Sequence, residues 1–128
     1  MICSKRGVDA VEHFQIRRVA TGVKFDLRSA NGEVIATSEV YKTEAACRKG
    51  VESVRKNAPL ASVEDQTLGE RRGNPKFEVY EDRSGQFRFR LKARNGGIIA
   101  VSENYTAKSA CLDGIEAVRS CCQQKGTL

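Results

Sequence analysis

The 128-residue chain contains one pattern of residues twice. The dipeptide Asn31-Gly32 recurs 64 positions later as Asn95-Gly96, and Ala46-Cys47 recurs at the same distance as Ala110-Cys111. Further pairs with this spacing are Phe25 and Phe89, Leu27 and Leu91, Ile35 and Ile99, Tyr41 and Tyr105, and Gly50 and Gly114. Such an internal repeat indicates two copies of one structural unit. Because a unit of about 60 residues is only marginally stable alone, we expect the copies to share one core.

Each copy begins with stretches in which apolar and polar residues alternate. Val23, Phe25 and Leu27 alternate with polar residues in the first copy, and the run 87–92 does so in the second. A period of two is typical of a β-strand with one buried face. Asn-Gly between two such stretches predicts a hairpin with a type I′ turn, in which both central residues have positive φ.

Each copy then continues with an amphipathic pattern that predicts a helix, over residues 43–57 and 107–121. Gly50 and Gly114 lie in the middle of these helices, where glycine costs about 1 kcal/mol relative to alanine. Their equivalent positions predict a close approach between helix backbone and sheet. Residues 61–65 alternate again and predict a fourth strand, for which residues 121–128 offer no clear equivalent.

These elements predict an α+β fold. We expect two tandem β-β-β-α(-β) repeats, at 14–65 and 76–122, joined by a linker at 66–75 within a single domain over residues 1–128. The repeats should form one largely antiparallel sheet with two helices packed on one face.

Several segments of both repeats resemble one known family. In the second repeat they are Phe77–Tyr80, Phe87–Ala93, Asn95-Gly96, Ile99–Glu103 with Tyr105, and Ser109–Val118, and in the first they are Asn31–Glu39, Gly50–Val54 and Asn57–Asp65. They are similar to the YegP-like family of small bacterial tandem-repeat proteins of unknown function. The resemblance implies exchanged C-terminal strands between the units, and it implies no activity.

The residues give no pattern typical of catalytic, metal or cofactor chemistry. His13 is the single histidine of the chain, and no spacing of ligands suits a metal site. The glycine-rich motifs that bind phosphate are missing. We therefore expect a protein that is not an enzyme and uses no cofactor.

The cysteines and the apolar runs bear on the cellular setting. Five cysteines without C-x-x-C spacing favour a reducing, cytoplasmic location. We expect Cys47 and Cys111 to pack against the sheet, and one of Cys121 and Cys122 to be exposed. The longest apolar run, Ile98–Val101, is far too short to span a bilayer, and the first residues lack a secretory signal. No membrane association is expected.

The face of the sheet opposite the helices, here called the outer face, is the candidate binding face. With Asn-Gly as the turn, Arg90 lies opposite Val101, Lys92 opposite Ile99 and Arg28 opposite Ile35. The candidate residues are Arg28, Ile35, Arg88, Arg90, Lys92, Arg94, Ile99 and Val101.

Opposite charges on neighbouring strands should weaken the positive field of this face. We expect Arg90 to pair with Glu78 and Arg88 with Glu103, each contributing roughly 0.2–1 kcal/mol. The cations expected to stay unpaired are Lys92, Arg94, Arg28 and one of Arg17 or Lys24.

Two functional hypotheses follow. The first is a non-enzymatic interaction module that docks a protein partner or a second copy of itself, through the outer face or an unfilled sheet edge. The alternative is weak, salt-sensitive nucleic-acid binding through the basic strand face, suggested by the net charge of +6. The duplicated Ser-Glu-x-Tyr segment is interpreted either as a paired polar site or, preferably, as a strand-to-helix junction.

Overall fold

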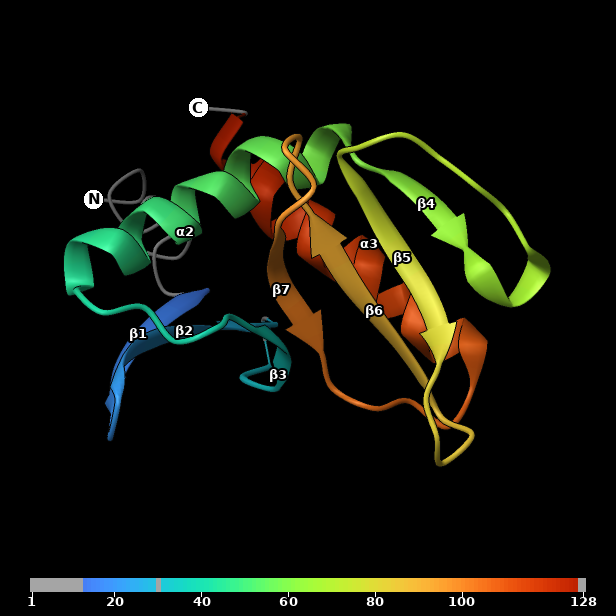
Figure 1. The fold of residues 1–128 in the computed structure, drawn as a ribbon, viewed down its shortest axis with the longest axis horizontal. Helices are drawn as coiled ribbons and strands as arrows, with labels where there is room; N and C mark the ends of the chain where they lie inside the picture. The colour runs from blue at the N-terminus through green and yellow to red at the C-terminus, as the bar shows by residue number, and fades with distance from the viewer. Residues whose placement is uncertain (1–12, 30, 127–128) are drawn as a thin grey trace.

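The computed structural model describes residues 13–29 and 31–126. Seven strands form one sheet in the order β1-β2-β3-β7-β6-β5-β4 (Figure 1). Their bounds are β1 Phe14–Val19, β2 Gly22–Arg28, β3 Val34–Thr37, β4 Ser62–Asp65, β5 Lys76–Glu81, β6 Phe87–Lys92 and β7 Ile98–Ser102. β3 and β7 pair antiparallel at the centre and so join the two repeats. The predicted α+β class and its largely antiparallel sheet are confirmed, while the residue boundaries of the repeats stay predictions.

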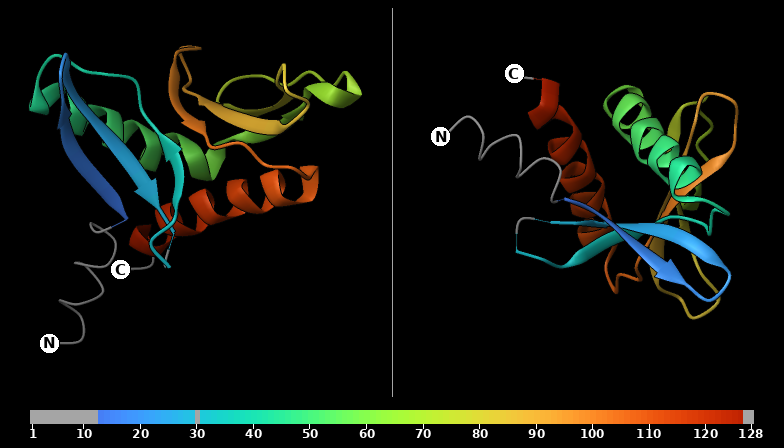
Figure 2. Two further views of the ribbon diagram at one scale, coloured as in Figure 1. Left: turned by 90° about the horizontal axis from the view of Figure 1, so that it is seen from below. Right: turned by 90° about the vertical axis from the view of Figure 1, so that its left-hand side faces the viewer.

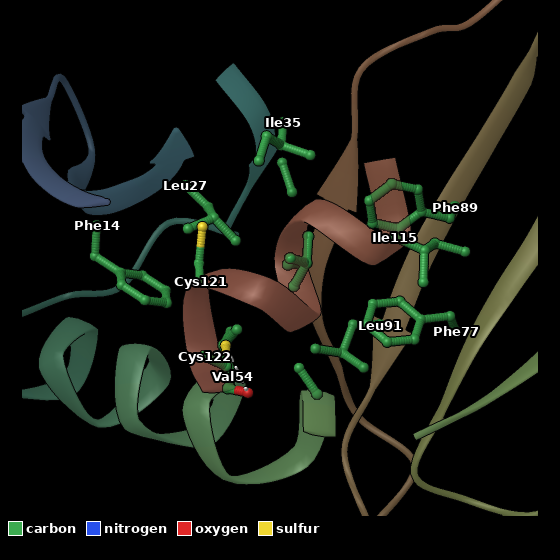
Figure 3. Close-up of a cluster of buried hydrophobic side chains, with 14 of the residues drawn as sticks. Phe14, Leu27, Ile35, Val54, Phe77, Phe89, Leu91, Ile115, Cys121 and Cys122 are labelled. Atoms are coloured by element: carbon green, nitrogen blue, oxygen red, sulfur yellow. Dashed lines mark hydrogen bonds between the residues drawn. The ribbon is translucent and has the colours of Figure 1, made fainter. Parts of the chain in front are cut away.

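Two helices, α2 (Glu44–Asn57) and α3 (Lys108–Gly126), pack on the inner face of this twisted sheet (Figures 1 and 2). α2 begins after Thr43, whose Oγ1 accepts a hydrogen bond from the Ala46 amide at 3.1 Å. Each helix contacts strands of both repeats: α2 lies against β1, β2 and β7, and α3 against β6 and β3. One continuous core therefore holds the repeats together (Figure 3).

The helix glycines approach the sheet as predicted. A Cβ atom placed on Gly114 would lie 2.5 Å from Tyr105 Oη and 3.1 Å from the Phe89 ring, and Gly50 has the same relation to Tyr41 and Phe25. These separations are too short for a methyl group. Both helices can therefore pack this closely only with glycine at the contact.

β4 is exchanged between the repeats. It follows α2 and the short 3-10 helix η1 (Ala58–Leu60), yet it pairs in parallel with β5 of the second repeat. The chain returns to β5 through a second 3-10 helix, η2 (Gln66–Leu68), and a loop over residues 69–75 (Figure 1). The exchange runs in one direction within the described residues, because α3 continues to Gly126 where a last strand would have begun.

The Asn-Gly hairpins differ from the predicted type I′ turns. The Gly32 amide donates to Ser29 O at 2.9 Å, and Gly32 has a φ of 89°. In the described chain no residue other than glycine has positive φ, so Asn95 does not adopt the predicted conformation. A type I turn followed by a left-handed glycine makes a three-residue loop with a bulge.

The bulge changes the strand register beside each turn. Arg28 lies opposite Val34 instead of Ile35. In the second repeat Lys92 lies opposite Ile98 instead of Ile99. Farther from the turn the predicted pairing of Arg90 with Val101 is confirmed.

Candidate functional site

The register shift corrects the candidate binding face. Ile35 is only 4% exposed, belongs to the core and lies beside Ala110, Gly114 and Ala117 of α3. Ile99 is partly buried and also packs against the core. The outer face therefore lacks the two isoleucines expected there. The other candidates are half-buried or, for Arg94, exposed: Arg28, Arg88, Arg90, Lys92, Arg94 and Val101.

One buried carboxylate organises the cations of the second repeat. Arg90 Nε donates to Glu78 Oε1 at 2.5 Å, which confirms that predicted pair. Lys76 and Lys92 lie 3.3 Å and 3.4 Å from Glu78 Oε2. Burial acts to raise the pKa of Glu78, but the hydrogen bonds from Arg90 and Lys76 and the charge of Lys92 outweigh burial and lower it. Lys92, expected to be unpaired, is instead part of this cluster.

The other predicted pair, between Arg88 and Glu103, does not form. Arg88 Nη2 donates to the carbonyl of Ser102 at 3.0 Å, at the point where β7 ends. The pairing of β7 with β6 stops there, and the Glu103 amide instead donates to Ile35 O of β3 at 3.3 Å. The guanidinium carbon of Arg90 also lies 4.5 Å from the centre of the ring of Tyr80, a half-buried residue, in a cation–π contact.

The first repeat has a similar ion pair on its outer face, but with the charges exchanged between the strands: the carboxylate lies on β2 and the arginine on β1. Asp26 is buried and accepts from Arg17 Nε at 2.7 Å and from the Thr37 hydroxyl at 2.9 Å. Arg28 donates to Gln15 Oε1 and to the carbonyl of Gly32, both at 2.7 Å. Both partners are neutral, and among the described residues Arg28 forms no ion pair, as expected of a cation without an opposing carboxylate.

The duplicated Ser-Glu-x-Tyr segment is a junction built around its serine. Ser102 Oγ accepts from the Phe89 amide at 2.9 Å and donates to Glu103 O at 2.7 Å. Ser38 does the same with Phe25 and Glu39. Tyr41 and Tyr105 pack against the core, as the preferred interpretation expected. Sequence reasoning missed the serine, although its recurrence in both repeats was a signal.

Both adjacent cysteines are buried, so the expectation of one exposed thiol is wrong. Cys121 Sγ lies 4.0 Å from Arg28 O and Cys122 Sγ lies 3.8 Å from Val54 O, on two sides of α3 (Figure 3). α3 passes between the first repeat's strands and α2, so neighbouring positions both meet protein. Burial raises the pKa of Cys122 to about 12 and that of Cys111 to about 11. These thiols stay protonated and pack as small apolar groups.

The edge of β5 shows how this fold receives an added strand. Val63 of β4 packs on the core side, and Glu64 on the outer side accepts from Lys76 Nζ at 2.8 Å. Asp65 accepts from Lys108 Nζ at 2.8 Å and caps η2 through the Thr67 amide. Burial acts to raise the pKa of Asp65, but these hydrogen bonds outweigh it and lower the pKa.

An arginine of α3 secures the start of the added strand. Arg119 Nη2 donates to Ala61 O at 2.5 Å, while Nη1 pairs with Glu116 at 2.7 Å. Its guanidinium carbon lies 5.5 Å from the centre of the Phe77 ring. We call this arrangement of arginine, glutamate and phenylalanine the arginine clamp.

The outer edge of β1, the side away from β2, carries the same clamp. Arg55 pairs with Glu52 at 2.7 Å and its guanidinium carbon lies 5.1 Å from the centre of the Phe14 ring. Among the residues that the structure describes, no strand pairs with this edge. Phe14 is 9% exposed and Ile16 is half-buried, whereas their counterparts on β5, Phe77 and Val79, are fully buried.

One position at the two edges differs in charge. Lys108, the first residue of α3, contacts Asp65 of β4. The equivalent first residue of α2 is Glu44, which pairs with Arg48 at 2.8 Å and is otherwise open to solvent. The edge of β1 thus repeats the architecture of the edge of β5 with the opposite charge at its far end.

Comparison with known proteins places the chain in a family. The sequence profile of a domain of unknown function, DUF1508, matches residues 20–65 and again 82–127. A UPF0339 protein of Photorhabdus laumondii is 38% identical over 109 residues, which are 84% of each chain. The solution NMR structure of yegP from E. coli, a protein of unknown function, matches with a TM-score of 0.68 and 31% identity, covering 85% of this chain and 84% of that one. The chain belongs to the YegP-like UPF0339 family.

A UPF0339 protein of Treponema denticola matches a shorter stretch. It is 64% identical over 44 residues, which are 34% of this chain and 76% of that protein. The similarity covers most of that protein but about a third of this one, as expected if single repeats and tandem repeats both occur in the UPF0339 family.

The described residues of this UPF0339 protein offer no metal cluster and no membrane span. They contain no group of three or more His, Cys, Asp or Glu side chains placed to hold an ion. Within the same residues, neither helix is long and apolar enough to cross a bilayer.

Proposed function

We propose that this UPF0339 protein is a non-enzymatic interaction module that accepts an extended segment of a partner polypeptide along the outer edge of β1. The observation that carries the proposal is the contrast between two equivalent edges of one sheet. β4 fills the edge of β5, whereas the edge of β1 has the same arginine clamp and no paired strand in the described chain.

The backbone of β1 supports this proposal. His13 O accepts from the Arg28 amide, and the antiparallel ladder then alternates, so Phe14, Ile16 and Arg18 direct their N–H and C=O groups away from β2. Such a row of unpaired groups is a template to which an extended peptide adds. Arg55 stands where it could donate to the carbonyl that begins such a strand, as Arg119 does to Ala61.

The partner is a different polypeptide because β1 is poorly suited to pair with itself. Arg17 and Arg18 are adjacent in the strand and point to opposite faces, so two copies of β1 paired antiparallel around them would bring two guanidinium groups together on each face of the sheet. Like charges directly opposite each other destabilise a strand pair.

The outer face supports binding less well than the edge. Its two expected isoleucines lie in the core or against it, and Arg90 and Lys92 share Glu78. Salt-resistant nucleic-acid binding needs several phosphate contacts made at once. Because Arg90 and Lys92 are paired with Glu78, the outer face offers fewer unpaired cations to phosphate, which favours the edge of β1 over the nucleic-acid alternative.

A peptide that carries the β4 sequence tests the proposal. We would titrate the isotope-labelled chain with a synthetic peptide of the sequence Asn57–Leu68 in which Asp65 is replaced by Asn, and follow amide signals by NMR. The Asp65→Asn change removes a charge whose partner, Lys108, is replaced by the acidic Glu44 beside β1. Phe14 and Ile16 amide signals are expected to shift and to gain protection from exchange.

Ile16→Pro, which removes an outward N–H, is expected to abolish these shifts, whereas Ile16→Ala should weaken them only. Arg55→Ala should weaken binding, and Lys49→Ala, at an exposed position of α2, serves as its control. Signals that change only along β5, or only at Arg90 and Lys92, would refute binding at the edge of β1.

A further inference from the structure

At the occupied edge of β5, one residue of the added strand β4 forms an ion pair with the helix beside it. Asp65 lies opposite Val79, two residues after Val63 and on the same side of β4. Its carboxylate meets Lys108 at 2.8 Å, at the start of α3. A lysine in the first turn is unfavourable for a helix, whose N-terminus carries partial positive charge. Lys108 and Asp65 thus compensate each other at this edge.

At the edge of β1 the same position faces the opposite charge. The residue of an added strand opposite Ile16 corresponds to Asp65, since Ile16 occupies the place of Val79. It would approach Glu44, the counterpart of Lys108. An aspartate there would be repelled by the Glu44 carboxylate, whereas a lysine or arginine would form an ion pair with it.

We infer that the segment accepted at β1 is an extended peptide with an apolar residue followed two positions later by lysine or arginine. The inference rests on the proposed function and specifies its partner. The apolar side chain takes the place of Val63 beside Phe14, which is 9% exposed, and the half-buried Ile16. The basic side chain takes the place of Asp65 and pairs with Glu44.

Arg48 does not prevent this pairing. Arg48 reaches Glu44 from the next turn of α2, and both side chains are largely exposed. One carboxylate can serve several cations, as Glu78 does for Arg90, Lys76 and Lys92. The added pair is exposed, so a preference of about threefold to tenfold is expected for lysine over aspartate at this position.

A charge-swap experiment tests the inference. Three peptides of the sequence Asn57–Leu68, with Lys, Asn or Asp at position 65, are titrated into the full chain, and affinity is taken from the β1 amide shifts. The expected order is Lys tighter than Asn, and Asn tighter than Asp. Glu44→Lys should reverse this order, and higher salt should reduce the differences in affinity between the three peptides.

Asp113→Lys on α3 makes the same change in net charge and should leave the order intact. Because the same three peptides are titrated into each protein, any effect of residue 65 on the free peptide cancels when the affinity ratios of two proteins are compared. If all three peptides bind at β1 and their order of affinity is the same in the wild type and in Glu44→Lys, the inference fails and the proposed function stands. If no peptide shifts the β1 amides, the proposed function fails as well.

Discussion

Among single residues, Ser102 supports the sheet most directly, through its buried hydroxyl. It accepts from the Phe89 amide and donates to Glu103 O where the chain departs from the sheet. An aspartate or glutamate there would bring a charge into the core, and alanine would leave the amide without a partner. A small hydroxyl therefore satisfies both groups, and Ser38 repeats the solution in the first repeat.

Ser102→Ala should lower the free energy of unfolding by about 1–3 kcal/mol, because a buried donor loses its acceptor. Urea denaturation followed by circular dichroism measures the change. Ser120→Ala, at an exposed position of α3, is the control and should change stability little. Equal effects of the two substitutions would show that the Ser102 hydroxyl is not needed.

Among the secondary-structure elements, the position of each helix on the sheet is set by a contact between one glycine of the helix and one tyrosine. Gly114 faces Tyr105 and Phe89, and Gly50 faces Tyr41 and Phe25. The tyrosines come from the segments after β7 and β3, which bridge back to Phe87 and Val23. Helix position is thus set by the strand-to-helix junction as much as by the apolar face of the helix.

Gly114→Ala should destabilise the protein by about 1–3 kcal/mol through overpacking, although alanine favours an isolated helix by about 1 kcal/mol. Tyr105→Phe removes the nearest atom, so the double variant should recover part of the loss. A double-mutant cycle from thermal or urea unfolding gives this coupling. Additive single effects, or a stabilising Gly114→Ala, would contradict the contact.

Across the molecule, the exchanged strand ties the repeats together through buried charge. Glu64 of β4 accepts from Lys76 of β5, from Gln66 and from the Arg72 amide. Burial acts to raise the pKa of Glu64, but these hydrogen bonds outweigh it and lower the pKa to about 2 from 4.5. The folded protein therefore holds Glu64 ionised where the unfolded chain would protonate it.

The stability due to Glu64 is fully present above about pH 4.5 and is lost as pH falls toward 2. Glu64→Gln should flatten the fall in unfolding free energy across that window by up to about 1.4 kcal/mol per pH unit, the equivalent of one proton. Urea unfolding at several pH values tests this. Parallel curves for the wild type and the variant would rule out an ionised Glu64.

Patterns within the amino-acid sequence were enough to predict the two repeats, the alternating strands, both helices and the close contacts at Gly50 and Gly114. The repeats are visible as identical residues at a constant spacing of 64, and the strands and helices as short periods of apolar residues, so both can be recognised from the sequence alone. The same patterns predicted the Arg90–Glu78 pair, because hairpin pairing away from the bulge follows simple alternation.

The burial of Ile35 and the pairing of the sheet edges, in contrast, are decided by the three-dimensional fold. One left-handed glycine, Gly32, makes a bulge that shifts the register and moves Ile35 into the core. The three cations around Glu78 come from two strands, and the parallel seat of β4 depends on residues far away in sequence. Contacts between distant segments leave no period in the sequence, and so the edge of β1, to which no strand pairs within the described residues, is recognised only by comparison with the filled edge of β5.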